Sequence, residues 1–202
     1  MATVAEAVAA LRAGELAVLP LDTVYGLVAS ALSEAPARKL ADAKGRDVQQ
    51  PIALVAADLE LLLECVPELV GQSEAIARAL LPGPYTLVFP NPARRYSWLT
   101  GLRPETIGVR VPEPSGRGSA VLQELGAFAA TSANVSGGPD PRSLAEVSKQ
   151  IRSAAAALVD GGELPGTPST VLDLTGAEPR VLREGAVPAA EALVRVAAAL
   201  SR

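Results

Sequence analysis

Short apolar runs alternate along this chain with longer segments in which apolar residues recur every third or fourth position. Short runs bounded by turn residues predict buried strands, and the longer spacing predicts helices that pack one face against them. The predicted strands cover residues 16–19, 51–56, 85–89, 106–111, 128–131, 157–159, 170–174 and 180–182. The predicted helices cover a segment that opens at a Thr3 capping box and ends at Gly14, and residues 33–43, 58–64, 73–81, 118–125, 143–151 and 189–200.

Strands and helices interleave over most of the chain, and the last strands follow one another directly. This order indicates an α/β domain built around a mixed sheet. A chain of 202 residues can bury a sizeable core. Residues 1–202 are therefore interpreted as a single domain, in which residues 91–103 and 161–168 form loops.

Polar residues gather in short clusters beside the predicted strands. The clusters are rich in hydroxyl side chains, glycines and arginines. Hydroxyls and backbone N–H groups donate hydrogen bonds, glycine lets the backbone approach a ligand closely, and arginine supplies a charged fork. Such clusters predict a site for phosphates and carboxylates. They cover residues 21–26, 44–46, 106–110, 131–137, 169–170 and 182–185.

Composition narrows the chemistry that such a site can perform. The chain has no histidine and one cysteine, Cys65. This excludes a Ser-His-Asp triad, makes a structural zinc site implausible and removes the commonest general base. Catalysis would therefore depend on positioning and electrostatics. Cys65 lies in an apolar stretch and is expected to be a small buried hydrophobe.

The charge balance bears on possible partners. A net charge of −4 argues against broad, non-specific nucleic-acid binding, which needs a basic surface, although a local basic groove is compatible with it. The sequence shows neither a secretory signal nor the ~20 consecutive apolar residues of a membrane span. A cytoplasmic protein without a membrane partner is therefore expected.

The predicted strand 106–111 places a cation on one face of the sheet. Because side chains alternate along a strand, Thr106, Gly108 and Arg110 share a face. A buried arginine is costly unless an anion pairs with it. That anion could be a ligand carboxylate or, as a structural alternative, a carboxylate of the chain such as Asp22 or Asp173.

Two more clusters allow both a structural and a functional interpretation. Lys44 and Arg46 could be solvated cations that favour the dipole at a helix C-terminus, or they could grip phosphates. The turn at residues 131–137 could bond its own backbone, or it could cradle a phosphate. The glycine-rich turn at residues 160–162 is interpreted as structural.

In this order, the clusters resemble those of the YrdC/Sua5 family of threonylcarbamoyl-AMP synthases, in its short single-domain form, from about Pro20 to Gly185. The resemblance implies a YrdC-like fold, in which a twisted mixed β-sheet is flanked by helices and carries a concave substrate groove. It places ATP contacts at Lys44, Arg46, Gln50, Thr106, Ser132, Asn134, Asp140 and Arg183. It places L-threonine contacts at Thr23, Tyr25, Arg110, Ala130 and Ser169.

The resemblance also implies a reaction. L-Threonine, bicarbonate and ATP would give threonylcarbamoyl-AMP, pyrophosphate and water, with Mg²⁺ bound largely through the nucleotide and water. No side chain is assigned as a general acid or base. A separate tRNA threonylcarbamoyl transferase complex would use the product for the t6A37 modification of tRNA, and the protein could itself contact tRNA.

Two alternatives belong to other classes of function. One is a YrdC-like protein that binds RNA without catalysis, which tRNA affinity without ATP consumption would favour. The other is carbamoyl transfer, as in multidomain hydrogenase-maturation proteins that carry a similar domain. Their zinc-finger and acylphosphatase-like parts have no counterpart in this sequence.

Overall fold

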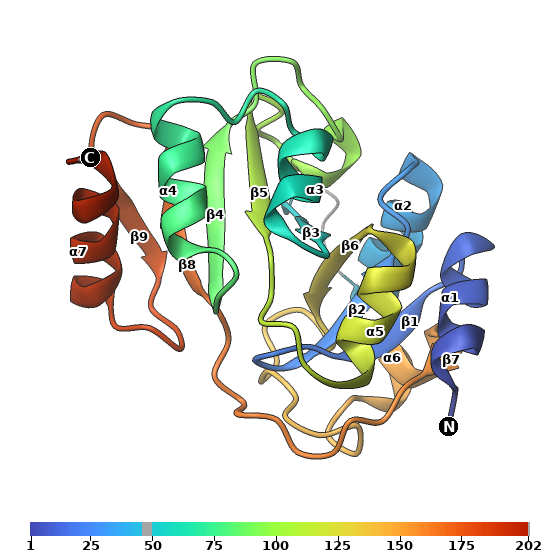
Figure 1. Cartoon of the computed structure of the whole chain (residues 1–202). Coiled ribbons are helices and arrows are strands. Elements are labelled where there is room, and N and C mark those ends of the chain that lie inside the picture. The colour runs from blue at the N-terminus through green and yellow to red at the C-terminus, as the bar shows by residue number, and fades with distance from the viewer. Residues whose placement is uncertain (46–49, 202) are drawn as a thin grey trace.

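The computed structural model describes residues 1–45 and 50–201. Within these ranges, strands form one nine-stranded mixed sheet in the order β7-β1-β2-β6-β3-β5-β4-β8-β9 (Figure 1). The strands are β1 (Ala17–Pro20), β2 (Tyr25–Ala29), β3 (Ala53–Ala56), β4 (Tyr85–Pro90), β5 (Thr106–Arg110), β6 (Ala127–Ser132), β7 (Ala157–Leu158), β8 (Thr170–Asp173) and β9 (Arg180–Arg183). The predicted α/β class with a mixed sheet is confirmed.

Helices cover the sheet on both faces. They are α1 (Val4–Arg12), α2 (Glu34–Ala43), α3 (Leu59–Cys65), α4 (Gln72–Leu80), α5 (Gly116–Leu125), α6 (Lys149–Ala154) and α7 (Ala189–Leu200), with a short 3₁₀ helix η1 (Ser97–Leu99). Figure 1 shows α1 and α5 together at the end of the sheet that carries β1 and β7, and α4 and α7 together at the end that carries β8 and β9. No helix in the described ranges is long and apolar enough to cross a lipid bilayer.

Two hydrophobic clusters pack against the two faces of the sheet. One joins α1 and α5 to strands at the β1 end, and the other joins α2, α4 and α7 to the opposite face. The first includes Val8, Leu11, Leu19, Val55, Val121, Phe128 and Ala130. The second includes Leu40, Leu54, Leu62, Ile76, Leu87, Phe89 and Val196. Both faces of the sheet are therefore anchored, which fixes the strand ends that carry the polar clusters.

Strand pairing brings the polar face of β5 next to β4 and β8. β5 runs antiparallel to β4, and β4 runs parallel to β8. In this register Val88 on β4 is aligned with Gly108 on β5 and with Asp173 on β8. The Asp173 carboxylate, at the end of β8, is thus placed two strands away from β5, the strand that carries Thr106 and Arg110.

The structure corrects three expectations about elements. β2 is an additional strand that the sequence did not predict, because all five of its residues are buried and no polar alternation marks it. α6 begins at Lys149 rather than at residue 143, because Ser148 caps it by accepting a hydrogen bond from the Ile151 amide at 3.3 Å. Cys65, at the end of α3, is only partly buried.

Candidate functional site

A cavity of about 410 Å³ lies on the face of the sheet that α1 and α5 cover only in part. Those helices pack on β1, β6 and β7, and the cavity continues over β3, β5, β4 and β8. Its volume falls within the range of small-molecule sites, roughly 300–1,000 Å³. The polar residues of its lining are Thr86, Thr100, Arg103, Thr106, Arg110, Thr131, Ser132, Ser169 and Arg183. The expected concave groove is therefore present.

The charge of this cavity is one-sided. Its lining contains three arginines, Arg103, Arg110 and Arg183, and none of its described members is an aspartate or a glutamate. The whole chain carries a net charge of −4. Because a cleft lined with one sign of charge attracts the opposite sign, the cavity favours anionic ligands in an otherwise acidic protein.

Arg110 is held from one side by two residues of the segment that connects β1 to β2. Its Nη2 donates to a carboxylate oxygen of Asp22 and to the Thr23 hydroxyl, 2.9 Å away. The second carboxylate oxygen of Asp22 accepts from the Glu113 amide at 3.2 Å. The salt bridge with Asp22 that the sequence allowed is thus present, and Asp22 and Thr23 fix the guanidinium rather than merely neutralise it.

The same guanidinium retains unused binding capacity. Arg110 is 7% exposed, and its Nε has no hydrogen-bond partner among the described residues. Burial lowers the pKa of Arg110, the Asp22 carboxylate opposes that shift, and the positive charge of Arg183 adds to it. A buried N–H without a partner is costly, and two cations in one cavity repel each other. An anion bound between them would offset the repulsion.

Ser169 and Arg183 form a second polar group at the same cavity, where β8 begins and β9 ends. Arg183 donates to the Ser169 carbonyl through Nη2 at 2.8 Å and Nε at 3.2 Å, and Nη2 lies 3.2 Å from the Ser169 hydroxyl. That hydroxyl also lies 2.8 Å from the hydroxyl of Thr86. The contacts described for Arg183 are with a neutral group, so its positive charge is available to a ligand.

Gly185 explains why β9 can approach β8 so closely. A Cβ atom at this position would lie 2.2 Å from the Pro168 carbonyl oxygen. The Thr170 hydroxyl secures the same approach by accepting from the Gly185 amide at 3.0 Å and donating to the Val187 carbonyl at 2.6 Å. The glycine and the threonine of these two predicted clusters therefore serve the packing that positions Arg183.

Lys44, Ser132 and Asn134 form a third polar group. Lys44 follows α2 and is 4% exposed, so the interpretation as a solvated cation is wrong. Its Nζ donates to the Ser132 carbonyl and, at 2.8 Å, to the Asn134 Oδ1. The Ser132 hydroxyl donates to the same Oδ1 at 2.7 Å. Lys44 thus fixes the turn after β6, and of these three side chains only Ser132 lines the cavity.

Tyr25 points its hydroxyl away from the cavity lining. The hydroxyl accepts from the Gly161 amide at 2.9 Å and lies 2.8 Å from the Gly162 carbonyl and 3.0 Å from an Asp160 carboxylate oxygen. Burial raises the pKa of Tyr25, and the Gly161 amide partly offsets that shift. The turn at residues 160–162 therefore has the structural role expected for it, and a threonine contact by Tyr25 stays a prediction.

The remaining predicted residues are distributed as follows. Thr106 and Ala130 line the cavity, so Thr106, Arg110, Ala130, Ser132, Ser169 and Arg183 are brought together there. Gln50 is exposed and Asp140 is partly buried, and neither belongs to the lining. Arg46 lies outside the described residues. The ATP and threonine contacts assigned to all these positions stay predictions.

Sequence reasoning did not single out Thr86 or Arg103, which also line the cavity. Thr86 occupies an alternate position of β4, so its face could be read from the strand period once the neighbours of β4 were known. Arg103 lies in a loop without hydrophobic periodicity. In the sequence, only its place three residues before Thr106 indicated that it could lie near the site.

Comparisons with known proteins support a common ancestry. A family model named for Sua5, YciO and YrdC and described as telomere recombination matches residues 9–185. The chain is 36% identical to the threonylcarbamoyl-AMP synthase of Pyrococcus abyssi over 182 residues, which cover 90% of this chain and 53% of that protein. It is 35% identical to a putative threonylcarbamoyl-AMP synthase of Mycobacterium tuberculosis over 186 residues, which cover 91% and 84% of the two chains.

Solved structures agree with the sequence comparisons. Sua5 of P. abyssi complexed with L-threonine matches with a TM-score of 0.83 at 36% identity, over 93% of this chain and 55% of that one. E. coli YciO matches with a TM-score of 0.82 at 25% identity, over 94% and 92%. The chain thus spans about half the length of the P. abyssi protein and most of the length of YciO. From the extent of the family match and the shared fold, this chain belongs to the Sua5/YciO/YrdC family.

Proposed function

We propose that this chain makes L-threonylcarbamoyl-AMP from L-threonine, bicarbonate and ATP and releases pyrophosphate. The observation that carries the proposal is Arg110, a buried cation with an unpartnered Nε among the described residues, in a cavity with two further arginines and no described carboxylate. Relatives named threonylcarbamoyl-AMP synthase support the same activity.

Arg110 would bind the carboxylate of threonine. Asp22 and Thr23 already occupy its Nη2, and its Nε is enclosed by the protein, so the two N–H groups of Nη1 would donate to the amino acid. A charge-assisted hydrogen bond of this kind is roughly twice as strong as a neutral one. Ala130 and Ser169, which line the same cavity, would flank the bound threonine.

The reaction would need no covalent enzyme intermediate. The threonine amine would lose a proton and bond to the carbon of bicarbonate with loss of water, giving an N-carboxy-threonine. A carboxylate oxygen of that product would attack the α-phosphorus of ATP. The bond from the α-phosphorus to the bridging oxygen would break, and pyrophosphate would leave with the electron pair.

The protein would accelerate these steps by holding anions together in a fixed geometry. Arg183 and Ser132 line the cavity and would contact the nucleotide. Lys44 and Asn134 would act largely through Ser132, since both contact it in the structure. This arrangement suits a chain that has no histidine to serve as a base.

Magnesium is expected to bind with the nucleotide. Among the described residues, no group of three or more Asp, Glu, Cys or His side chains could hold a metal ion. The cavity lining supplies hydroxyls and arginines, which fit a Mg²⁺ ion held by phosphate oxygens and water rather than by the protein. When bound, the ion would neutralise charge on the leaving pyrophosphate.

The product is an acyl-adenylate, so a second enzyme must consume it. That consumer is proposed to be a tRNA threonylcarbamoyl transferase complex that forms t6A37, which would place the present reaction in the cytoplasm.

The test is direct. Purified protein is incubated with ATP, Mg²⁺, bicarbonate and L-threonine, and pyrophosphate and the mass of threonylcarbamoyl-AMP are measured. Product that requires all three substrates is expected, together with its loss in Arg110→Ala. A folded wild-type protein that binds tRNA but forms no product would contradict the proposal and favour an RNA-binding role without catalysis.

A further inference from the structure

Arg103 is the cation of the cavity whose position the proposed reaction does not explain. It lies in the loop before β5, at the Thr106 end of that strand, and its side chain is 51% exposed. Arg110 lies at the other end of β5. Because a strand rises about 3.3 Å per residue, the Cα atoms of Thr106 and Arg110, at the two ends of β5, are about 13 Å apart. Arg103 therefore serves a different part of the cavity from the proposed threonine carboxylate.

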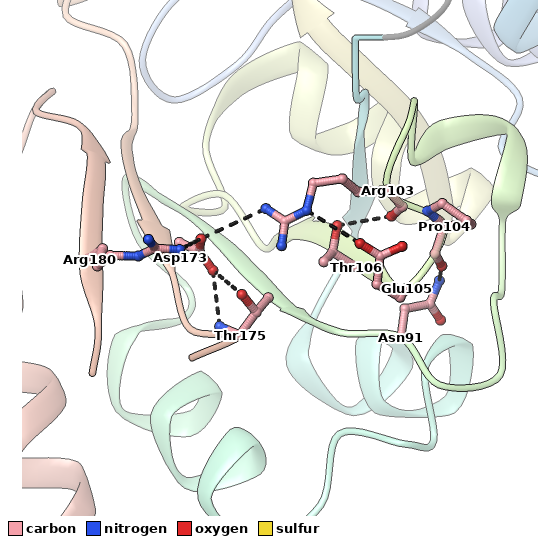
Figure 2. Close-up of polar contacts among 8 residues, drawn as sticks. All are labelled: Asn91, Arg103, Pro104, Glu105, Thr106, Asp173, Thr175 and Arg180. Carbon is pink, nitrogen blue, oxygen red and sulfur yellow. Dashed lines mark hydrogen bonds and ion pairs between the residues drawn. The ribbon is translucent and has the colours of Figure 1, made fainter. Parts of the chain in front are cut away.

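The ion pairs of Arg103 are long. Its Nε lies 3.4 Å from the Glu105 carboxylate, and its Nη1 lies 3.9 Å from the Asp173 carboxylate (Figure 2). Charge-assisted hydrogen bonds are normally about 2.7–2.9 Å. Glu105 is itself exposed, so solvent screens that pair. Neither contact would hold the Arg103 guanidinium against a stronger anion.

Asp173 does not depend on Arg103. It is 1% exposed, and it accepts hydrogen bonds from the Thr175 amide at 3.0 Å, from the Thr175 hydroxyl and from Arg180 at 2.8 Å. Figure 2 shows Arg180 and Arg103 approaching Asp173 from different sides. Removal of the Arg103 side chain from this group would leave a buried carboxylate that is still satisfied.

The backbone of Arg103, in contrast, is fixed. Its carbonyl accepts from the Thr106 amide at 2.9 Å and from the Thr106 hydroxyl at 3.0 Å. Asn91 holds the next two residues, because its side-chain Nδ2 donates to the Pro104 carbonyl at 3.1 Å and its backbone N–H donates to the Glu105 carbonyl at 2.7 Å. The loop backbone is therefore fixed while the Arg103 side chain is weakly held. The side chain can move to a ligand without a rearrangement of the backbone.

The hydroxyls at this end of the cavity cannot replace Arg103 as donors. A carbonyl oxygen can only accept, so the Thr106 hydroxyl donates its one hydrogen bond to the Arg103 carbonyl. For the same reason, the Thr100 hydroxyl donates its hydrogen bond to the Ser97 carbonyl, 2.9 Å away. Toward a ligand, both threonines offer lone pairs. Among the described residues at this end of the cavity, Arg103 is a side chain that can donate to an anionic oxygen.

We propose that Arg103 binds a phosphate group of the nucleotide, exchanging its long contacts with Glu105 and Asp173 for charge-assisted hydrogen bonds. Thr106 and Thr100 then accept from donors of the same ligand, such as its sugar hydroxyls. This inference rests on the proposed function for the identity of the nucleotide. The cation site itself requires only a compact phosphate anion.

The experiment measures binding by calorimetry for wild type, Arg103→Ala, Arg103→Gln and Arg195→Ala. Arg195 is the matched control, since its side chain is 52% exposed, is paired with Glu191 and does not line the cavity. The ligands are Mg²⁺-ATP, AMP, adenosine, pyrophosphate and L-threonine. Thermal unfolding verifies that each variant folds, and Arg103→Gln replaces Arg103→Ala if the alanine variant does not.

Arg103→Ala is expected to weaken ATP and pyrophosphate about tenfold, the loss of one charged hydrogen bond, while adenosine and threonine change less than about twofold. Arg195→Ala is expected to bind every ligand as wild type does. Unchanged ATP and pyrophosphate affinity in the Arg103 variants, or an equal loss of adenosine, would overturn the inference. Wild-type protein that binds pyrophosphate through Arg103 but not ATP would refute the proposed function alone. Wild-type protein that binds neither would refute both.

Discussion

At the scale of single residues, Asp22 determines how Arg110 is presented to the cavity. Its carboxylate joins the guanidinium to the Glu113 amide, and the side chains of both partners of the ion pair are more than nine-tenths buried. Asp22→Asn should therefore lower the free energy of unfolding by about 3 kcal/mol, the cost of breaking a buried pair. It should also raise the KM for threonine about tenfold, because the unpaired guanidinium loses its orientation.

The two effects of Asp22→Asn can be separated from a general loss of structure. The KM for ATP should change less than about twofold, since the contacts described for Asp22, with Arg110 and the Glu113 amide, lie at the proposed threonine end of the cavity. Urea unfolding and steady-state kinetics on the same preparation supply both values. Equal rises in the two KM values, or an unchanged KM for threonine, would count against a positioning role for Asp22.

Asp173 gives the fold a dependence on pH. Burial alone would raise the pKa of its carboxyl, but hydrogen bonds from Thr175 and Arg180 outweigh burial and hold the pKa below its ordinary value of about 3.9. A lowered native pKa contributes stability above the ordinary value, and that stability is lost as the pH falls through the native value.

Asp173→Asn should therefore cost about 2 kcal/mol of unfolding free energy at neutral pH, and this difference should shrink as the pH falls below about 4. Urea unfolding from pH 7 to pH 3, compared between the two proteins, measures it. A difference that stays constant over this range would mean that the native pKa of Asp173 is not lowered.

Single residues also mark how far sequence reasoning reached. Arg110 could be predicted, because alternation along a strand places it on one face with Thr106 and burial of an arginine demands an anion. The role of Lys44 could not be predicted, because its hydrogen bond to Asn134 joins residues 90 positions apart. Arg103 lies in a segment without hydrophobic periodicity. Its proposed role follows from the structure, in which the neighbouring Thr100 and Thr106 hydroxyls already donate to backbone carbonyls.

At the scale of elements, the contact between α5 and β1 controls the segment that carries Asp22. Glycine is required at position 118, because a Cβ atom there would lie 1.8 Å from the Pro20 carbonyl oxygen. A substitution of alanine for glycine inside a helix ordinarily stabilises the protein by roughly 0.5–1 kcal/mol. Gly118→Ala should instead destabilise by about 2 kcal/mol, the typical cost of overpacking.

The same change should raise the KM for threonine, since Pro20 lies two residues before Asp22. Ser119→Ala, the next position of α5, is the matched control and should shift the unfolding free energy by less than about 0.5 kcal/mol. Urea unfolding gives the free energies of both variants, and steady-state kinetics gives the KM for threonine. A stabilised Gly118→Ala would mean that α5 can move away from β1 without cost.

Elements were predictable where packing leaves one face polar. α1, with its capping box, and α7, with its amphipathic pattern, follow the sequence closely. β2 is buried on both faces, so its sequence carries no alternation, and its strand pairing with β1 and β6 is a tertiary property. The start of α6 was missed because Glu146 accepts from the Arg142 amide at 2.8 Å and so stabilises a turn where the pattern predicted helix.

At the scale of the whole molecule, positive charge is concentrated rather than abundant. The chain has 22 acidic and 18 basic residues, yet three arginines share one cavity without a described carboxylate in its lining. Net charge follows from the composition, whereas the local charge of the cavity depends on the sheet order that brings β5, β8 and β9 together.

This distribution predicts which phosphates the protein can bind. At about 0.15 M salt the Debye length is about 8 Å, so an acidic surface repels a polynucleotide only weakly but also offers it few phosphate contacts. A compact anion can instead enter the cavity and reach its arginines.

Inorganic pyrophosphate should displace Mg²⁺-ATP at concentrations near its own Kd, whereas an equal concentration of tRNA should leave most of the ATP bound. Competition followed with a fluorescent ATP analogue, repeated at higher salt, measures both. Displacement by tRNA as effective as that by pyrophosphate would place the cavity arginines within reach of a polynucleotide, and RNA binding would then account for their charge better than a nucleotide substrate does.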